Sequence, residues 1–502
     1  MTKSCVFLIA LVAHYSIVHA QWGLTGNAGT NPPTNFLGTT DAKSLLFKVN
    51  GQQAGLLDYN SATGNAVFGY QALLSSTGTS NTGVGYQALF SNTSGSNNDA
   101  FGYKALYSNT TANANSAFGN NALYSNTTGY NNSAFGLYAL YSNSTGTYNF
   151  AAGASSLFTN TSGNYNTAAG YSALRNNTTA NGNVAVGNES LYSNTTGTAN
   201  TGNGFWALHS NTTGSNNTAI GVSVLTTMNG ADDNTAVGDS VLWQNTSGYN
   251  NTAVGYAASW YNTTGYQNTA IGSGAIGFNT TGYNNTAFGM NSNWNASDAG
   301  TYNTDLGTGV VADPSGNFAT NTTGIGSATA TTASNQVMFG YSTTTSIGGY
   351  ANWSNISDGR FKRNVKENVP GLSFISLLRP VTYNLDVAGI NEYLRPVATS
   401  TPHRMTSFAR ADETAVKEKE KIVHTGFIAQ DVDSTARKLN YDFSGVDIPK
   451  NNKELYSLRY SDFVVPLVKA VQELSSVNDS LRTRVSALRS EIIKIRQLLE
   501  SK

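Results

Sequence analysis

Residues 115–131 of the chain read NSAFGNNALYSNTTGYN, and the same phrase begins again at Asn132. The first glycine of the phrase recurs along the chain at Gly69, Gly85, Gly102, Gly119, Gly136, Gly153, Gly170, Gly187, Gly204, Gly221, Gly238, Gly255, Gly272 and Gly289. The first step is 16 residues and the next twelve are 17. A period held this strictly indicates one structural unit stacked on copies of itself.

Each copy is expected to form one coil of a β-solenoid. About half of its residues are Asn, Thr, Ser and Gly, which favour turns and caps over helix interiors. Short apolar pieces such as Ser133–Phe135 and Ala139–Tyr141 lie between these turn clusters and are typical of strands. We therefore expect a mainly β fold with a solenoid body over residues 63–350, whose coils rise by about 4.8 Å each.

Both faces of the first strand carry apolar side chains. Ala117 and Phe118 are adjacent in the sequence, so they point to opposite faces of a strand. A thin solenoid buries only its inner face, so the second apolar row favours packing against partner chains. The alternative is a wider monomeric solenoid with an exposed aromatic stripe. The Asn-x-Ala-x-Gly phrase resembles the head repeats of trimeric autotransporter adhesins, which form β-rolls in homotrimers, although the period of 17 is longer than is usual there.

Charged residues divide the chain in two. The 28 basic and 28 acidic residues make up 11% of the chain, but residues 21–350 hold only 4 basic and 10 acidic ones, whereas residues 351–502 hold 23 and 18. The zero net charge removes the electrostatic argument for nucleic-acid binding. One Cys and five scattered His exclude a disulfide framework and a Cys-rich metal site, so we expect no metal and no cofactor.

The N-terminus has the pattern of a secretory signal peptide over residues 1–20. Lys3 is followed by an apolar run, and small residues precede Gln21. We expect a secreted or cell-surface protein with no membrane span after the signal is removed. Residues 21–62 are expected to form an N-terminal β segment, with a hairpin around Asn50-Gly51.

The repeat leaves its ligand open. Triplets such as Asn109-Thr110-Thr111 match glycosylation acceptors, but turn chemistry explains them equally well. Thr-rich arrays could bind ice or crystalline glycan, and rows such as Tyr107, Tyr124 and Tyr141 could stack on sugars. The few carboxylates of the body form no pair at a repeated spacing, so an enzyme acting on external glycans has no support. A host or surface ligand, glycan or protein, stays unknown.

Beyond residue 350 a new order of motifs begins. Ser357-Asp358-Gly359-Arg360-Phe361-Lys362 is followed by LLRPVTY at residues 377–383, by GFIAQDV at residues 426–432, and by Tyr460 before an amphipathic helix. This succession resembles the C-terminal intramolecular chaperone and auto-processing domain of endosialidases and phage tail spikes. We assign residues 351–460 to it. The stretch 384–425 is longer than expected, and its role is open.

The resemblance implies a domain that trimerises, guides folding of the β-structure before it, and cuts itself off once. The family's Ser-Lys dyad maps onto Ser357 and Lys362. A serine hydroxyl needs a base, and a lysine is a base only when neutral, a state that burial and nearby positive charge such as Arg360 favour. Attack of Ser357 on the Ile356 carbonyl passes through a five-membered ring, which puts the cut at Ile356-Ser357. Asp358 is a candidate orienting group.

The last helix, within residues 461–502, is expected to form a coiled coil. Its apolar seam alternates in steps of 4 and 3 through Leu467, Val471, Leu474, Asn478, Leu481, Val485, Leu488, Ile492, Ile495 and Leu499. Val and Ile at one seam position with Leu at the other usually favour two strands, and Asn478 would fix the register. The family resemblance implies three strands, and we follow it.

The sequence thus favours a secreted homotrimeric fibre that is matured by a single-turnover serine autoprotease. The competing hypothesis is a structural or adhesive fibre in which Ser357 and Lys362 are inactive, so that the C-terminal domain stays attached as a permanent trimer clamp.

Overall fold

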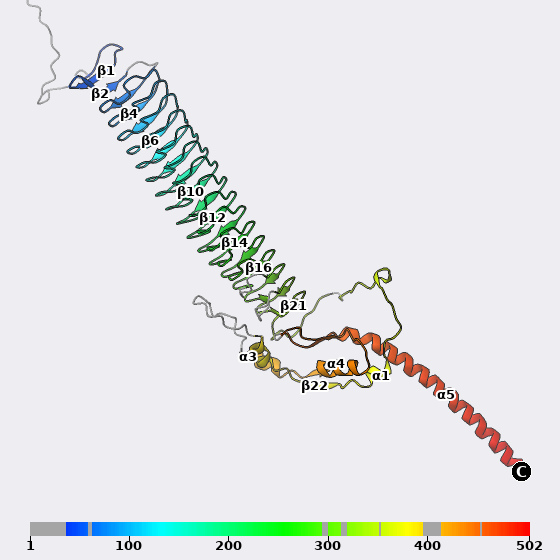
Figure 1. Cartoon of the computed structure of the whole chain (residues 1–502). Coiled ribbons are helices and arrows are strands. Elements are labelled where there is room, and N and C mark those ends of the chain that lie inside the picture. Colours follow the sequence, from blue (N-terminus) through cyan, green and yellow to red (C-terminus); the bar gives the residue numbers. More distant parts are fainter. Residues whose placement is uncertain are drawn as a thin grey trace, which may run out of the picture.

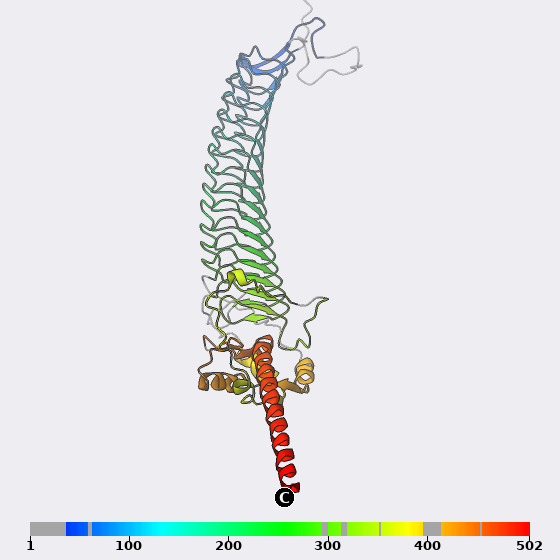
Figure 2. The same ribbon diagram turned by 90° about the vertical axis from the view of Figure 1, so that its right-hand side faces the viewer.

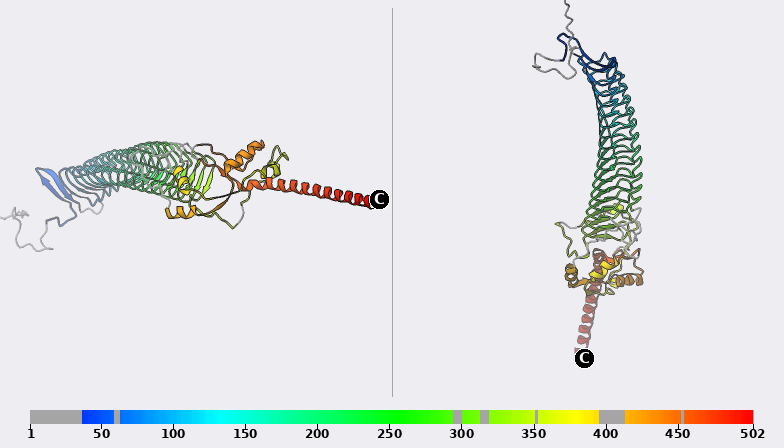
Figure 3. Two further views of the ribbon diagram at one scale, coloured as in Figure 1. Left: turned by 90° about the horizontal axis from the view of Figure 1, so that it is seen from below. Right: turned by 90° about the vertical axis from the view of Figure 1, so that its left-hand side faces the viewer.

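The structure is a computed structural model that describes residues 37–58, 63–293, 300–312, 319–350, 353–394, 413–451 and 454–501. The expected signal peptide lies outside these residues. Figure 1 shows a long solenoid rod with a small α/β domain at its C-terminal end and a single helix leaving that domain. The turned views show the rod bending gently along its length, with the helix pointing away from it (Figures 2 and 3).

The body is a parallel β-solenoid in which each coil contributes one strand to a continuous main sheet. Each strand pairs in parallel with the strand of the next coil, so that Ala117 of one coil lies opposite Ala134 of the next. The successive strands are β3 (Ala66–Phe68), β4 (Thr82–Val84), β5 (Asp99–Phe101), β6 (Ser116–Phe118), β7 (Ser133–Phe135), β8 (Phe150–Ala152), β9 (Thr167–Ala169), β10 (Val184–Val186), β11 (Thr201–Asn203), β12 (Thr218–Ile220), β13 (Thr235–Val237), β14 (Thr252–Val254), β15 (Thr269–Ile271), β16 (Thr286–Phe288), β17 (Thr304–Leu306), β19 (Thr323–Ile325) and β21 (Val337–Phe339). The solenoid expected from the repeat is therefore confirmed.

Two further pairings complete the sheet structure of the body. Near its C-terminal end, β18 (Val311–Ala312) pairs in parallel with β20 (Ala330–Thr331). At its N-terminal end, β1 (Leu45–Val49) and β2 (Gln52–Leu57) form the hairpin expected around Asn50-Gly51, and β2 pairs antiparallel with β3. The hairpin covers an edge that would otherwise offer unpaired backbone groups to another chain.

In the coils from β3 to β16 the expected second strand is not present among the described residues, whereas the coils of β17 and β19 each have a short one, β18 and β20. The segment Ala139–Tyr141 forms a turn, because Tyr138 and Leu140 adopt positive φ angles of 59° and 52°. A segment in which every second residue adopts a left-handed backbone conformation cannot form an extended strand. The turn still bonds to its neighbour, since Leu140 N–H donates to the Ser156 carbonyl of the next coil at 3.0 Å. Stacking between coils thus continues without a second regular strand.

The inside of the rod combines an apolar column with two asparagine ladders. Ala117, Ala122 and Leu123 are fully buried, as are their counterparts in neighbouring coils. The asparagines were expected in turns, but one per coil precedes each strand and another follows each leucine turn, and both rows are buried. The first ladder runs through Asn65, Asn81, Asn98, Asn115, Asn132, Asn149, Asn166, Asn183, Asn200, Asn217, Asn234, Asn251, Asn268, Asn285 and Asn303. The second runs through Asn92, Asn109, Asn126, Asn143, Asn160, Asn177, Asn194, Asn211, Asn245, Asn262 and Asn279.

Most ladder asparagines link their own turn to a neighbouring coil, and the second ladder is interrupted between Asn262 and Asn279. The Asn143 amide Nδ2 donates to Asn126 Oδ1 at 2.9 Å and to the Gly146 carbonyl at 3.0 Å. Asn143 Oδ1 accepts from Asn160 Nδ2 at 2.7 Å. Polar groups buried and fully bonded in this way stabilise one register and exclude others. The asparagine of the triplet at Asn109 belongs to the same ladder and is fully buried, so a glycan could attach only to an unfolded chain.

The C-terminal domain is a small α/β unit. The 3₁₀ turn η1 (Gly359–Phe361) comes first, followed by helix α1 (Leu372–Ile375). The other elements are β22 (Val381–Tyr383), α2 (Val387–Tyr393), α3 (Glu413–Glu420), β23 (His424–Gly426), α4 (Ala429–Lys438), β24 (Val446–Asp447), β25 (Ser457–Leu458), η2 (Tyr460–Phe463) and α5 (Val464–Glu500). Strand β22 pairs antiparallel with β23, and β24 with β25. The long stretch 384–425 thus contains two helices among its described residues.

Two of the motifs recognised in the sequence contribute to this domain's core: Val432 of the GFIAQDV phrase is buried in it, and Leu378 of the LLRPVTY phrase packs against it. Phe374, Val432, Phe443 and Phe463 are buried together. Gly426 admits the Tyr460 ring, because a Cβ at this position would lie 2.2 Å from the Tyr460 hydroxyl oxygen. That oxygen accepts a hydrogen bond from the backbone N–H of the next residue, Phe427, at 3.1 Å. The GFIAQ phrase and Tyr460 are therefore parts of one packing unit.

Helix α5 is anchored at its start and exposed over the rest of its length. Glu473 Oε2 accepts the Leu372 N–H at 2.7 Å, which ties α5 to the N-terminus of α1. The seam residues are exposed on both sides of this contact: Val471 is 65% exposed and Leu499 70%. Among the described residues, none of the helices is both long and apolar enough for a membrane crossing.

One acidic residue interrupts the apolar column. Asp305 in β17 stands where Ala287 stands in the coil before and Gly324 in the coil after, and it is fully buried. In the described part of the chain neither carboxylate oxygen has a hydrogen-bond partner. Loss of water raises the pKa of the Asp305 carboxyl to about 7. The charged form is therefore disfavoured inside the rod.

We expect Asn143→Ala to lower the free energy of unfolding by about 3 kcal/mol. The substitution leaves Asn126 Oδ1 buried without its hydrogen-bond donor, which costs roughly 1–3 kcal/mol. It also removes one bond from the Gly146 carbonyl and one from the Asn160 amide, which keep Asn132 and Gly163 as partners, at roughly 0.5–1.5 kcal/mol each. The exposed Thr145→Ala in the same turn is the control and should change stability by less than about 0.5 kcal/mol. Chemical denaturation followed by circular dichroism measures both. Equal stability of the two variants would contradict a structural ladder.

We expect Asp305→Ala to remove a pH dependence of stability. Because the folded state holds the Asp305 proton up to about pH 7, well above the ordinary carboxyl value, the wild-type free energy of unfolding should fall as pH rises from about 4 to 7. Above pH 7 the variant should be the more stable protein, by up to about 4 kcal/mol. Melting temperatures at pH 4, 6 and 8 test this, with Asp305→Asn as a neutral control that should also lose the slope.

Candidate functional site

The candidate site lies in the linking segment between the solenoid and the C-terminal core. The Ser357 hydroxyl and the Lys362 amine, predicted as a pair from the sequence, lie together: Lys362 Nζ donates to Ser357 Oγ at 2.8 Å. Five residues separate them in sequence, and the turn η1 brings the chain back to close this distance.

The turn that closes the pair is held by Asp358. Its carboxylate caps η1 by accepting the Arg360 N–H at 2.9 Å, and it pairs with the Arg360 guanidinium, Nη2 to Oδ2, at 2.6 Å. Hydrogen bonds from Arg360 hold the pKa of the Asp358 carboxyl below its usual range. The Phe361 N–H then donates to the Asp358 carbonyl at 3.1 Å. Asp358 therefore positions the backbone that carries Lys362, and its own carboxylate bonds to Arg360.

This geometry changes the part expected of Arg360. The sequence suggested that its positive charge would favour neutral Lys362, but the charge is paired with Asp358. Arg363 Nη1 turns to the Arg360 carbonyl at 2.9 Å and to the Lys362 carbonyl at 3.3 Å. Burial is thus the larger remaining means of deprotonating the lysine.

In the single chain the site is open to water. Ser357 and Lys362 are both exposed, and the apolar residues around them are exposed as well: Ile356 by 95% and Phe361 by 75%. Neither side chain is shielded from water in the single chain, and the nearby Arg360 guanidinium is paired with Asp358. The pair is therefore assembled in position but not yet in the environment that nucleophilic catalysis needs.

The aromatic row of Tyr107, Tyr124 and Tyr141 does not offer free ring faces to a sugar. The Tyr107 and Tyr124 rings stack at 5.1 Å with planes 4° apart, and Tyr124 and Tyr141 stack at the same distance. The row continues to Phe158, where the Arg175 guanidinium covers the next face. Sugars bind to aromatic faces, and here each face is covered by the neighbouring coil, so the row stabilises stacking.

The threonine hydroxyls of the turns also contact the neighbouring coil. Thr110 Oγ1 donates to the Thr127 carbonyl of the next coil at 3.0 Å, and Thr127 repeats the bond to Ser144. These hydroxyls therefore bind their own backbone. No group of three or more His, Cys, Asp or Glu that could hold a metal ion occurs among the residues that the structure describes.

Comparison with known proteins assigns a class to the C-terminal domain. Residues 357–439 match the family model described as chaperone of endosialidase, a family of autoproteolytic intramolecular chaperones. The match begins at Ser357. Neither the curated proteins nor the solved structures contain a match to the chain. The solenoid rod followed by this domain fits a tail-fibre-like protein.

Two features of the structure escaped the sequence analysis. Asp305 could have been found, because an acid replaces the alanine of the repeat in the phrase Asn303-Thr304-Asp305-Leu306-Gly307. The contacts that join Gln336 to Glu454 could not have been found, because 118 residues separate the partners and neither stands in a motif.

Proposed function

We propose that the protein is a secreted homotrimeric fibre whose C-terminal domain acts as an intramolecular chaperone and then cuts itself off between Ile356 and Ser357. The observation that carries this proposal is the 2.8 Å bond between Lys362 Nζ and Ser357 Oγ at the first residue of the family match. The solenoid supplies the fibre, and the expected signal peptide would route it out of the cell.

The proposed reaction needs only the chain and water. Lys362, once neutral, takes the Ser357 hydroxyl proton while Oγ attacks the Ile356 carbonyl carbon. The peptide C–N bond breaks as an ester forms, and the released amine of Ser357 takes up a proton. Water then hydrolyses the ester, which leaves a carboxylate on Ile356 and restores the serine hydroxyl.

Assembly would supply what the single chain lacks. The exposed apolar side chains at Ile356 and Phe361 are candidates for burial by partner chains, and that burial would also desolvate Lys362 and favour its neutral form. Cleavage would then follow trimer formation. A cleaved chain would then indicate that its trimer had assembled.

Two exposed surfaces support self-association. The α5 seam forms an unpartnered apolar stripe along a 37-residue helix, which is about 55 Å long. On the solenoid, the outward residue of each strand is also partly exposed, as in Phe118 at 37% and Phe288 at 55%. Contiguous apolar surface of this extent is typical of an interface. Packing of three copies around the seam and these strands would cover both.

The competing function is an uncut fibre with a permanent trimer clamp. It has the same fold and the same assembly, and it differs only in whether Ser357 reacts. The exposed state of Ser357 and Lys362 in the single chain is the observation that favours it.

We expect Ser357→Ala and Lys362→Ala to slow cleavage by at least about a hundredfold, because one removes the nucleophile and the other the base. Lys362→Arg keeps the charge but stays protonated, so it should also block the cut. The exposed Lys366→Ala is the control and should cleave normally. Intact mass spectrometry of purified protein gives the two fragment masses. A folded wild type that keeps its full length would favour the uncut fibre.

We expect three chains per particle, held largely by α5. Burying one leucine contributes roughly 2 kcal/mol, so Leu481→Glu, which changes all three helices, should raise the concentration needed for assembly at least a hundredfold, as an order-of-magnitude estimate. Arg482→Glu, outside the seam, is the matched control. Light scattering on Ser357→Ala protein, in which the helix stays attached, measures the mass. A particle of two chains, or an unchanged mass for Leu481→Glu, would contradict the expectation.

A further inference from the structure

The asparagine ladder ends differently at the last coil. Gln336 stands at the ladder position before β21, and its side chain folds back into its own coil. Its Oε1 accepts from Thr332 N–H at 2.8 Å and from Ala333 N–H at 3.1 Å. Its Nε2 donates out of the solenoid, to Glu454 Oε1 of the C-terminal domain at 3.0 Å.

The Glu454 side chain, which accepts the bond from Gln336, is fixed in place by neighbouring residues. Glu454 is buried, and its Oε2 accepts the Lys450 N–H at 2.6 Å. Asn451 completes the link in two directions: its Oδ1 accepts the Glu454 N–H at 2.9 Å, and its Nδ2 donates to the Thr332 carbonyl at 2.7 Å. Thr332, Gln336, Asn451 and Glu454 thus form a closed set of contacts, the end clamp.

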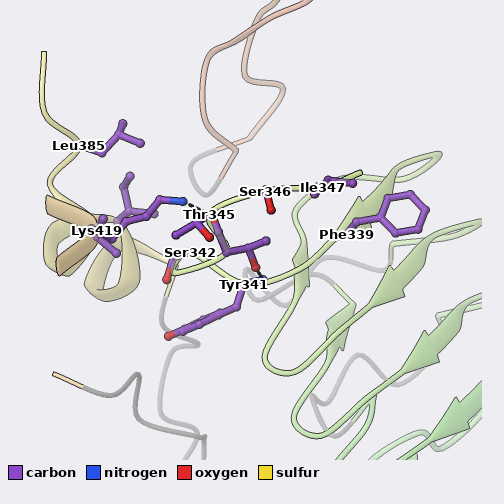
Figure 4. Close-up of a pocket in the computed structure, with 11 residues that line it drawn as sticks. Phe339, Tyr341, Ser342, Thr345, Ser346, Ile347, Leu385 and Lys419 are labelled. Atoms are coloured by element: carbon purple, nitrogen blue, oxygen red, sulfur yellow. Dashed lines mark hydrogen bonds between the residues drawn. The ribbon is translucent and has the colours of Figure 1, made fainter. Parts of the chain in front are cut away.

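Outside the end clamp the junction is loosely packed. A cavity of about 460 Å³ lies between the segment after β21 and helices α2 and α3, lined among others by Phe339, Ile347 and Ile390 (Figure 4). Lys419 Nζ crosses this region to the Thr344 carbonyl. The buried apolar clusters of the solenoid and of the C-terminal domain are separate. Docking therefore depends on a few polar contacts rather than on a shared core.

We propose that Asn451 and Glu454 recognise the finished last coil. The turn that carries the Thr332 carbonyl and the Gln336 amide is fixed on the rod where β21 lies against β19 and the Gln336 carbonyl accepts the Thr323 N–H at 2.8 Å, so the finished coil holds both groups in a set place. The partner of this surface is thus the folded end of the solenoid. Because the clamp joins residues on either side of Ile356-Ser357, it holds the domain on the rod without the covalent link.

The clamp also explains why a glutamine pairs with a glutamate. The Gln336 amide cannot flip, because its Oε1 is needed by two backbone N–H groups. Gln336→Glu keeps both of those bonds but sets two carboxylates against each other. In Glu454→Gln the side-chain oxygen is still needed to accept the Lys450 N–H. The new amide NH₂ group therefore faces the Gln336 NH₂ group, which places two donors against each other. The double exchange restores one donor and one acceptor.

A reciprocal exchange tests the proposal. We expect each single variant to speed hydrogen exchange about tenfold at amides that close the last coil, such as Thr323, Asn335 and Gly340, because the coil loses its outer support. The double variant should return to within about twofold of the parent, since the interaction is pairwise. Gln267→Glu, at an exposed site of an inner coil, is the charge control and should match the parent.

The role of the clamp rests on the proposed chaperone function, so all variants are made in full-length Ser357→Ala protein, where exchange is measured whether or not the wild type cuts itself. Parent-like exchange in both single variants would overturn the clamp. Exchange in the double variant as fast as in the singles would overturn it as well. Failure of wild-type cleavage would count against the proposed function and leave this measurement intact. If Gln336→Glu does not fold, Glu454→Gln and the double variant still give the comparison.

Discussion

Backbone hydrogen bonding between successive coils is the constraint on which the rest of the molecule depends. A coil can bond to the next along its whole path only if both follow the same path. Gly119 shows how tight this is: its φ is 145°, and a Cβ would lie 2.4 Å from the Gly136 carbonyl oxygen. Only glycine accepts that conformation and that approach. The strict period of the sequence is therefore a requirement of the stacking.

Most of the fold follows from the repeat. Identical coils must stack, polar turn residues must separate short strands, and the alanine beside Phe118 must face inward. The number of strands per coil could not be predicted, because positive φ angles at Tyr138 and Leu140 depend on the closed path of the coil and not on local propensity. The asparagines were placed in turns for a similar reason: their second partner lies 17 residues away, in a coil that the local sequence does not show.

At the candidate site the sequence predicts residues but not their surroundings. The pairing of Ser357 with Lys362 was predicted from the resemblance to the chaperone family. The pairing of Asp358 with Arg360 is a local detail of the turn, and it removes the charge that had been expected to act on the lysine. In the proposed mechanism the burial of Lys362 comes from assembly with partner chains, so neither the sequence nor the structure of one chain contains it. The residues of the end clamp could not be predicted from the sequence either, because the complete fold is needed to bring them into contact.

The plan of the rod has a consequence for how such proteins change over time. Its two ends are specialised, with a hairpin at β3 and the end clamp beside β21, while the coils between β5 and β16 are nearly interchangeable. Loss or gain of 17 residues in this interval keeps every ladder in register and moves the ends by one coil, about 4.8 Å. The length of the rod can thus change in steps of one coil by recombination between repeats, without a change to either of its ends.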